Sequence, residues 1–80
     1  MKFKKTVNRH SDKFVSYEAK KEYVRFLITT FDGGDTYTLT ISDTRKDILG
    51  RMLPRTLYRE TGIQSLEEAK NKAMNYELLQ

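Results

Sequence analysis

The sequence predicts an α+β domain, in which a helix covers one face of a small antiparallel sheet of three or four strands. Two strand-like segments, residues 22–31 and 36–42, flank a DGGD turn at 32–35, a pattern typical of a β-hairpin. A helix signature begins at Ser65, close to the end of the sequence. Because the strands precede the helices instead of alternating with them, an antiparallel sheet is favoured over a parallel one.

The hairpin register follows from the turn, whose glycines can supply the positive φ that tight hairpins need. Both a two-residue and a four-residue loop place Ile28 opposite Leu39 and Phe26 opposite Ile41. We therefore expect these four side chains in the core, together with Val24 and Tyr37. The opposite, outer face is expected to carry Tyr23, Arg25, Leu27, Thr29 and Phe31 beside Thr36, Thr38, Thr40 and Ser42.

Further strands are expected before the hairpin. Residues 13–19 alternate, with Val15, Tyr17 and Ala19 on one side, which predicts a strand. A helix from Ser11 is the rival interpretation, since Val15, Ala19 and Tyr23 also fit helical spacing. Residues 2–7 are expected to add an edge strand, whose lysines would oppose unwanted pairing with other chains.

After the hairpin the spacing of the apolar residues changes from that of a strand to that of a helix. Residues 48, 49, 52 and 53 form a helical stripe, which predicts a short helix near 45–53 with Thr44 as its N-cap. Pro54 should end or kink this helix, because proline lacks the N–H and crowds the preceding turn. Residues 55–62 fit either a second helical turn or a short strand.

The clearest helix begins at Ser65. Ser65 and Glu68 form a capping box, and Glu68 with Lys72 makes a favourable i,i+4 pair. Its apolar stripe consists of Leu66, Ala69, Ala73 and Tyr76. The two alanines should let this helix lie close to the sheet.

Composition narrows the class of protein. The 80 residues suit one domain, with enough apolar and aromatic side chains for a core, although the net charge is +4. There is no cysteine, so disulfides and cysteine-based metal sites are excluded and a reducing compartment fits. No uninterrupted apolar run exceeds three residues, too few for a membrane span or a signal peptide. We expect a cytoplasmic protein that does not contact a membrane.

Neither catalysis nor cofactor or metal binding is predicted. His10 is the only histidine, and no Ser, Cys or acid stands at a recognisable spacing from it. The DGGD segment lacks the alternating acids of a calcium loop and fits a turn instead. Glu67 and Glu68 diverge by about 100° on a helix, so capping and the helix dipole explain them better than acid–base chemistry.

The outer face of the hairpin is the candidate binding surface. A later segment, 43–60, could fold over it, or it could contact a partner protein or a second copy of the chain, or stack nucleic-acid bases. Eight Lys and Arg within residues 1–25 and five within 45–59 favour an acidic or polyanionic partner. Arg51, Arg55 and Arg59 would share one face if the helix continued through Pro54, although the proline favours separate solvated arginines. The predicted binding residues are Tyr23, Arg25, Leu27, Phe31, Arg51, Arg55 and Arg59.

The stretch from Ser65 to Lys70 is similar to the end of many small strands-then-helix domains, among them DNA-binding domains of mobile-element integrases. The similarity covers little beyond the capping chemistry of one helix. Size, basic charge and the absence of a catalytic motif suit an accessory protein of a phage or mobile element. We expect a non-enzymatic accessory or regulatory protein that binds another protein or forms a homodimer, with nucleic-acid binding as the alternative.

Overall fold

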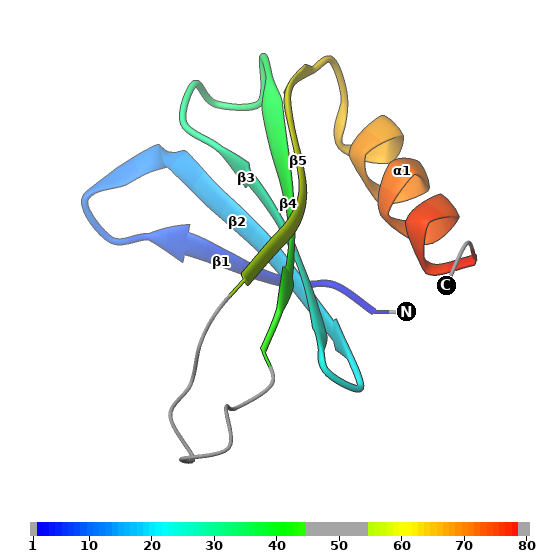
Figure 1. Cartoon of the computed structure of the whole chain (residues 1–80). Coiled ribbons are helices and arrows are strands. Elements are labelled where there is room, and N and C mark those ends of the chain that lie inside the picture. The colour runs from blue at the N-terminus through cyan, green and yellow to red at the C-terminus, as the bar shows by residue number, and fades with distance from the viewer. Residues whose placement is uncertain (1, 45–54, 79–80) are drawn as a thin grey trace.

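The computed structural model describes residues 2–44 and 55–78 and confirms the α+β class. The described residues form one sheet of five antiparallel strands and one helix (Figure 1). The elements are β1 (Lys4–Asn8), β2 (Ser11–Lys21), β3 (Val24–Thr30), β4 (Tyr37–Asp43), β5 (Arg55–Ile63) and α1 (Leu66–Leu78).

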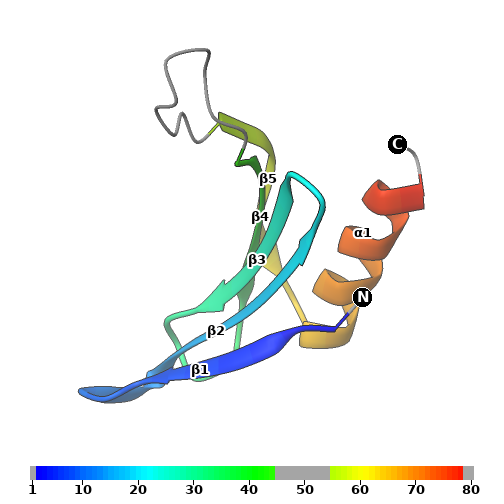
Figure 2. The same cartoon turned by 90° about the horizontal axis from the view of Figure 1, so that it is seen from below.

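The sheet is a simple meander, because the strands neighbour one another in the order in which they occur in the chain. Helix α1 lies on one face of the sheet, and no other described element covers the opposite face (Figure 2). Every strand pair is antiparallel and consecutive in the chain. Each part of the sheet can therefore form from local hairpins.

The hairpin of β3 and β4 has the predicted register. Phe26 lies opposite Ile41, and Ile28 lies opposite Leu39. All four side chains are buried, whereas Thr38 and Thr40 alternate with them and are only partly buried. The two-residue period of the strands therefore assigns one face to the core, as the sequence indicated.

The turn between these strands is held by one carboxylate. Asp32 accepts hydrogen bonds from the Thr36 hydroxyl (2.6 Å), the Thr36 backbone N–H (3.1 Å) and the Thr30 hydroxyl (2.8 Å). Gly33 and Gly34 have φ of 75° and 105°, which confirms that the turn needs positive φ. The bonds from Thr36 and then Thr30 hold the pKa of Asp32 well below its usual range.

The segments before the hairpin are strands, as predicted. β2 runs from Ser11 to Lys21, so the rival helix from Ser11 is wrong, and β1 is an edge strand. One boundary differs from the prediction: Glu22 and Tyr23, assigned to a strand from the sequence, form the turn between β2 and β3. Glu22 has a φ of 56°, although no glycine marks the turn.

Residues 55–62, left open between helix and strand, belong to β5, and this raises the strand count above the predicted three or four. β5 pairs with β4 through two register irregularities, one of them between Ile41 and Ser42. Leu57 is the extra residue there, since Ile41 pairs with Tyr58 and Ser42 pairs with Thr56. The predicted helix near 45–53 lies outside the described residues.

Helix α1 begins as the capping box predicts. The Ser65 hydroxyl accepts a hydrogen bond from the Glu68 backbone N–H at 3.1 Å. Ala69 and Ala73 are completely buried against the core of the sheet, with Leu66 and Tyr76 packed beside them. The small side chains let α1 approach closely enough to close the core.

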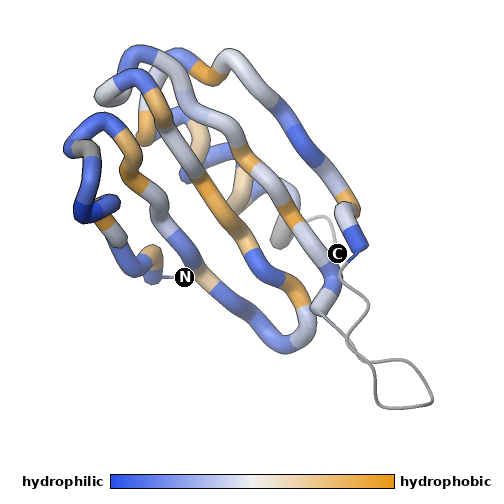
Figure 3. Tube along the Cα trace, turned by 90° about the vertical axis from the view of Figure 1, so that its left-hand side faces the viewer, coloured by the Kyte–Doolittle hydropathy of each residue, from blue (hydrophilic) through white to orange (hydrophobic). Residues whose placement is uncertain are grey.

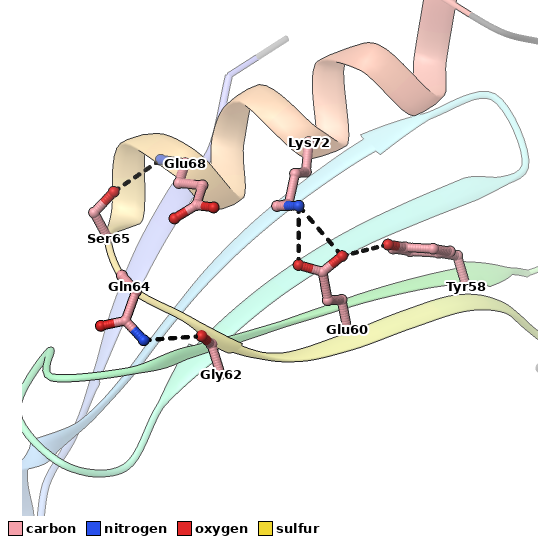
Figure 4. Close-up of polar contacts among 7 residues, drawn as sticks. All are labelled: Tyr58, Glu60, Gly62, Gln64, Ser65, Glu68 and Lys72. Atoms are coloured by element: carbon pink, nitrogen blue, oxygen red, sulfur yellow. Dashed lines mark hydrogen bonds and ion pairs between the residues drawn. The ribbon is translucent and has the colours of Figure 1, made fainter.

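A polar network also ties α1 to β5 (Figure 4). The Glu60 carboxylate pairs with the Lys72 ammonium at 3.0 Å and accepts a hydrogen bond from the Tyr58 hydroxyl at 2.5 Å. The bond from Tyr58 lowers the pKa of Glu60, and the same bond raises the pKa of Tyr58. Lys72, expected to pair with Glu68, thus forms its ion pair with the sheet.

We predict that Ala73→Asp unfolds the protein. An uncompensated buried charge costs roughly 3–5 kcal/mol, a large part of the about 5–15 kcal/mol that stabilises a typical domain. Met74→Asp is the matched control, because Met74 is the next residue and is 49% exposed. Thermal denaturation should show a lost or strongly lowered transition for the first variant and little change for the second; equal curves would mean that α1 does not close the core.

A second prediction concerns acid stability. Because the pKa of Asp32 is lowered on folding, its ionised form stabilises the folded protein above the ordinary pKa of 3.8, and this contribution is lost as the pH falls below that value. Asp32→Asn should therefore weaken the dependence of melting temperature on pH below about pH 4. Asp35→Asn removes an equal charge from the same loop and serves as the control. An Asp32→Asn curve parallel to that of the parent protein would contradict this assignment.

Candidate functional site

The candidate site is the side of the sheet turned away from α1, here called the outer sheet face (Figure 3). Residues that are directly paired across neighbouring strands point to the same face of a sheet. The strand register therefore shows which residues belong to the outer sheet face. They are Lys4, Thr6, Ser16, Glu18, Lys20, Arg25, Leu27, Thr29, Thr38, Thr40, Ser42, Thr56 and Arg59.

These side chains form three rows that run across the strands. The first consists only of hydroxyls: Thr6, Ser16, Thr29 and Thr38. The second has a cation at each end and passes through Lys4, Glu18, Leu27, Thr40 and Arg59. The third passes through Lys20, Arg25, Ser42 and Thr56. The outer sheet face therefore combines hydroxyls with four cations and a single carboxylate.

Arg25 is the central cation of this face. One of its terminal nitrogens pairs with the Glu18 carboxylate at 2.9 Å, and the two side chains are 40% and 38% exposed. The Nε atom of Arg25 is buried and has no hydrogen-bond partner among residues 2–44 and 55–78. Glu18 thus fixes the direction of the guanidinium, and the buried Nε atom is not accessible to a ligand.

The aromatic residues expected on this face lie at its ends. Tyr23 is in the turn between β2 and β3, and Phe31 follows the last residue of β3. Phe31 is 64% exposed and contacts Phe14 edge-to-face, with ring centroids 5.2 Å apart. Both rings line a shallow, mainly apolar hollow of about 230 Å³, which borders the hydroxyl row because Thr6, Ser16 and Thr29 also line it.

The predicted arginine stripe does not form. Arg55 and Arg59 are in strand β5, not in a helix, and the bulge at Leu57 places them on opposite faces. Arg59 pairs with Thr40 on the outer sheet face, whereas Arg55 pairs with Asp43, whose side chain is buried on the helix side. Arg51 lies outside the described residues. Segment 55–60 extends the sheet beside β4 and does not fold over the outer sheet face.

No group of three or more metal-ligating side chains occurs in the described parts of the chain. The backbone N–H of His10 donates to the Asn8 side chain at 2.8 Å in the turn between β1 and β2. Asp32, considered above as a calcium ligand, uses its carboxylate to hold its own turn. Within residues 2–44 and 55–78, no helix is long and apolar enough to cross a membrane.

Sequence reasoning missed Phe14 and the cations Lys4 and Lys20. The alternation of β2 contained the signal: Val15, Tyr17 and Ala19 point to the core, so Ser16, Glu18 and Lys20 must point outward. The sequence did not show the register between β2 and β3, and it is this register that places Lys20 beside Arg25.

Comparison with protein-family models, with curated protein sequences and with solved structures finds no match to this chain. Its function must therefore be inferred from the outer sheet face.

We predict that Phe14 and Phe31 interact measurably but are not needed for folding. An edge-to-face pair contributes about 0.5–1.5 kcal/mol beyond the area that it buries. A double-mutant cycle with Phe14→Ala and Phe31→Ala, followed by denaturant unfolding, should give a coupling energy in that range and leave all variants folded. A coupling energy of zero would mean that the rings do not pack together in solution, and loss of the fold would mean that they belong to the core.

Proposed function

We propose that this protein is a non-catalytic nucleic-acid-binding module that uses its outer sheet face. The observation that carries the proposal is the combination of hydroxyl and cationic side chains on that face. Serine, threonine, lysine and arginine provide many of the contacts to phosphate oxygens in nucleic-acid complexes. A net charge of +4 supplies the long-range attraction that such complexes need.

The positions of the rings change the preference that the sequence suggested. A partner protein was expected because Tyr23, Leu27 and Phe31 would together form an apolar, aromatic surface. The rings of Tyr23 and Phe31 lie at the ends of the strands. Only Leu27 adds a large apolar side chain to the middle of the outer sheet face. The centres of protein–protein interfaces are depleted in lysine and serine, and their energetic hot spots are poor in threonine. Phosphate binding therefore suits this composition better.

A partner protein is the second candidate, and one specific observation favours it. The hollow beside Phe14 and Phe31 is lined mainly by apolar surface and could hold an apolar side chain of a partner. In that case binding would depend on the two rings and only weakly on the cations of the outer sheet face.

The proposal predicts steep salt dependence. With three to four phosphate contacts, affinity for a short nucleic-acid probe should fall roughly 40- to 150-fold between 50 and 200 mM salt. Lys20→Gln should reduce the slope of log affinity against log salt by about one. Fluorescence anisotropy with labelled single- and double-stranded oligonucleotides measures both quantities.

Lys70→Gln provides the matched control. Lys70 is on the helix side, above the rings of Phe3 and Tyr17, so its charge should not contribute to the binding slope. Equal effects of Lys20→Gln and Lys70→Gln would indicate a response to net charge alone, without a defined site. Absence of binding to any oligonucleotide, together with a protein ligand lost on Phe14→Ala or Phe31→Ala, would establish the second candidate instead.

A further inference from the structure

We infer that β1 accepts an acidic, extended peptide of a partner protein as a sixth strand of the sheet. The surface is the edge of β1 that faces away from β2, here called the β1 edge. This inference goes beyond the proposed function and does not depend on it. Three features carry it: the exposure of β1, the regularity of its pairing with β2, and its charge.

β1 is at one end of the sheet and has a single neighbouring strand. That neighbour is β2, and all five residues of β1 are exposed. No element formed by residues 2–44 and 55–78 lies against the β1 edge (Figure 2). Alternate backbone N–H and C=O groups of an edge strand point away from the sheet and can bind a further strand. The backbone of β1 can therefore donate and accept the hydrogen bonds that an extended peptide needs.

β1 suits strand addition better than β5, the strand at the other end of the sheet. The pairing of β1 with β2 is regular from Lys4 to Val7, and the register shifts only at the last residue, Asn8. β5 pairs with β4 through two register irregularities within its length. Bulges twist an edge strand and disrupt the spacing of its backbone groups, and proteins use them to discourage edge pairing. A regular ladder can therefore be continued beyond β1 more readily than beyond β5.

The charge of the segment indicates which peptide can bind. Residues 2–11 contain the cations Lys2, Lys4, Lys5 and Arg9 and no acid. The three lysines form no ion pair within residues 2–44 and 55–78. Opposite charges across neighbouring strands stabilise a sheet, so carboxylates on an added strand would pair with these lysines.

The lysines of β1 lie on both sides of the sheet. Lys5 pairs with Tyr17 on the helix side, whereas Lys4 is opposite Glu18 on the other side. The Glu18 carboxylate is already paired with Arg25 at 2.9 Å, so it does not compete strongly for Lys4. A shallow hollow of about 340 Å³, lined in part by Lys4 and by other lysines, borders β1 there and could receive a carboxylate of the peptide.

The same charges disfavour a second copy of this chain at the β1 edge. Pairing of two β1 strands would bring two basic segments together, and like charges across neighbouring strands destabilise a sheet. Lysines on an edge strand discourage pairing with most chains for this reason. An acidic strand converts the repulsion into attraction, so the lysines both reject unsuitable strands and select a complementary one.

The test uses the whole 80-residue chain and a synthetic peptide, Thr-Val-Thr-Glu-Glu-Thr-Glu-Thr, blocked at both ends. In antiparallel pairing its valine can face Val7 while its adjacent glutamates face Lys5 and Lys4. Isothermal titration calorimetry should show binding, and the largest amide shifts of 15N-labelled protein should fall on residues 4–8. The same peptide with lysine in place of each glutamate should not bind.

A pair of charge reversals tests the site. Lys5→Glu should weaken peptide binding by about tenfold or more, because it replaces an attraction with a repulsion. Arg59→Glu is the matched control: it makes the same change of charge on β5 and should have a much smaller effect. Lys5 is not part of the outer sheet face, so this result is independent of nucleic-acid binding.

Methylated peptides test strand addition on the parent protein itself. In an added strand, alternate N–H groups point toward β1 and the others point away. Methylation of one alternate set of peptide nitrogens should therefore abolish binding, whereas methylation of the other set should preserve it. Side-chain attraction without strand pairing would make the two methylated peptides equivalent.

Each contrary outcome overturns the inference. These outcomes are no binding of the glutamate peptide at concentrations up to about 1 mM, amide shifts centred on α1, β5 or Phe31, equal losses with Lys5→Glu and Arg59→Glu, and equal effects of the two methylated peptides. None of them bears on the proposed function, whose tests use oligonucleotides. A circular dichroism spectrum matching that of the parent protein establishes that each variant is folded.

Discussion

The close packing of α1 on one face of the sheet is the interaction on which the rest of the structure depends. Ala69 and Ala73 lie against a layer formed by Phe26, Ile28, Leu39 and Ile41, and all six side chains are essentially inaccessible to solvent. In a chain of 80 residues this is the only apolar layer that the described residues provide. Small domains bury a modest fraction of their surface, so displacement of this helix would remove most of the hydrophobic stabilisation.

This packing also determines which surface is left for binding. The strand period is two, so residues between the buried ones must point away from the helix. In β3 and β4 those residues are Arg25, Leu27 and Thr29, and Thr38, Thr40 and Ser42. Register and burial together therefore assign the hydroxyls and cations to one continuous face. The ion pair between Glu18 and Arg25 then gives the centre of that face a fixed orientation.

The sequence alone predicted those parts of the fold that depend on local signals. The register of β3 and β4 followed from alternation and the turn at 32–35, and the start of α1 followed from its capping box. β5 could not be assigned because Arg55–Ile63 has neither a clear strand period nor a helical one, and β4 provides its pairing. The bulge at Leu57 has no local signature, yet it separates Arg55 from Arg59. Likewise, Glu22 adopts positive φ without a glycine, which moved Tyr23 from the strand into a turn.

The division of the sheet into a structural face and a binding face is tested most directly by nuclear magnetic resonance. Uniformly 15N-labelled protein would be titrated with a short DNA duplex while the shift of each backbone amide is followed. The account predicts that the largest changes fall on Lys20, Arg25, Leu27, Thr40 and Arg59, and that the amides of α1 near Ala73 change little. Changes concentrated on α1, or confined to Phe14 and Phe31, would contradict it.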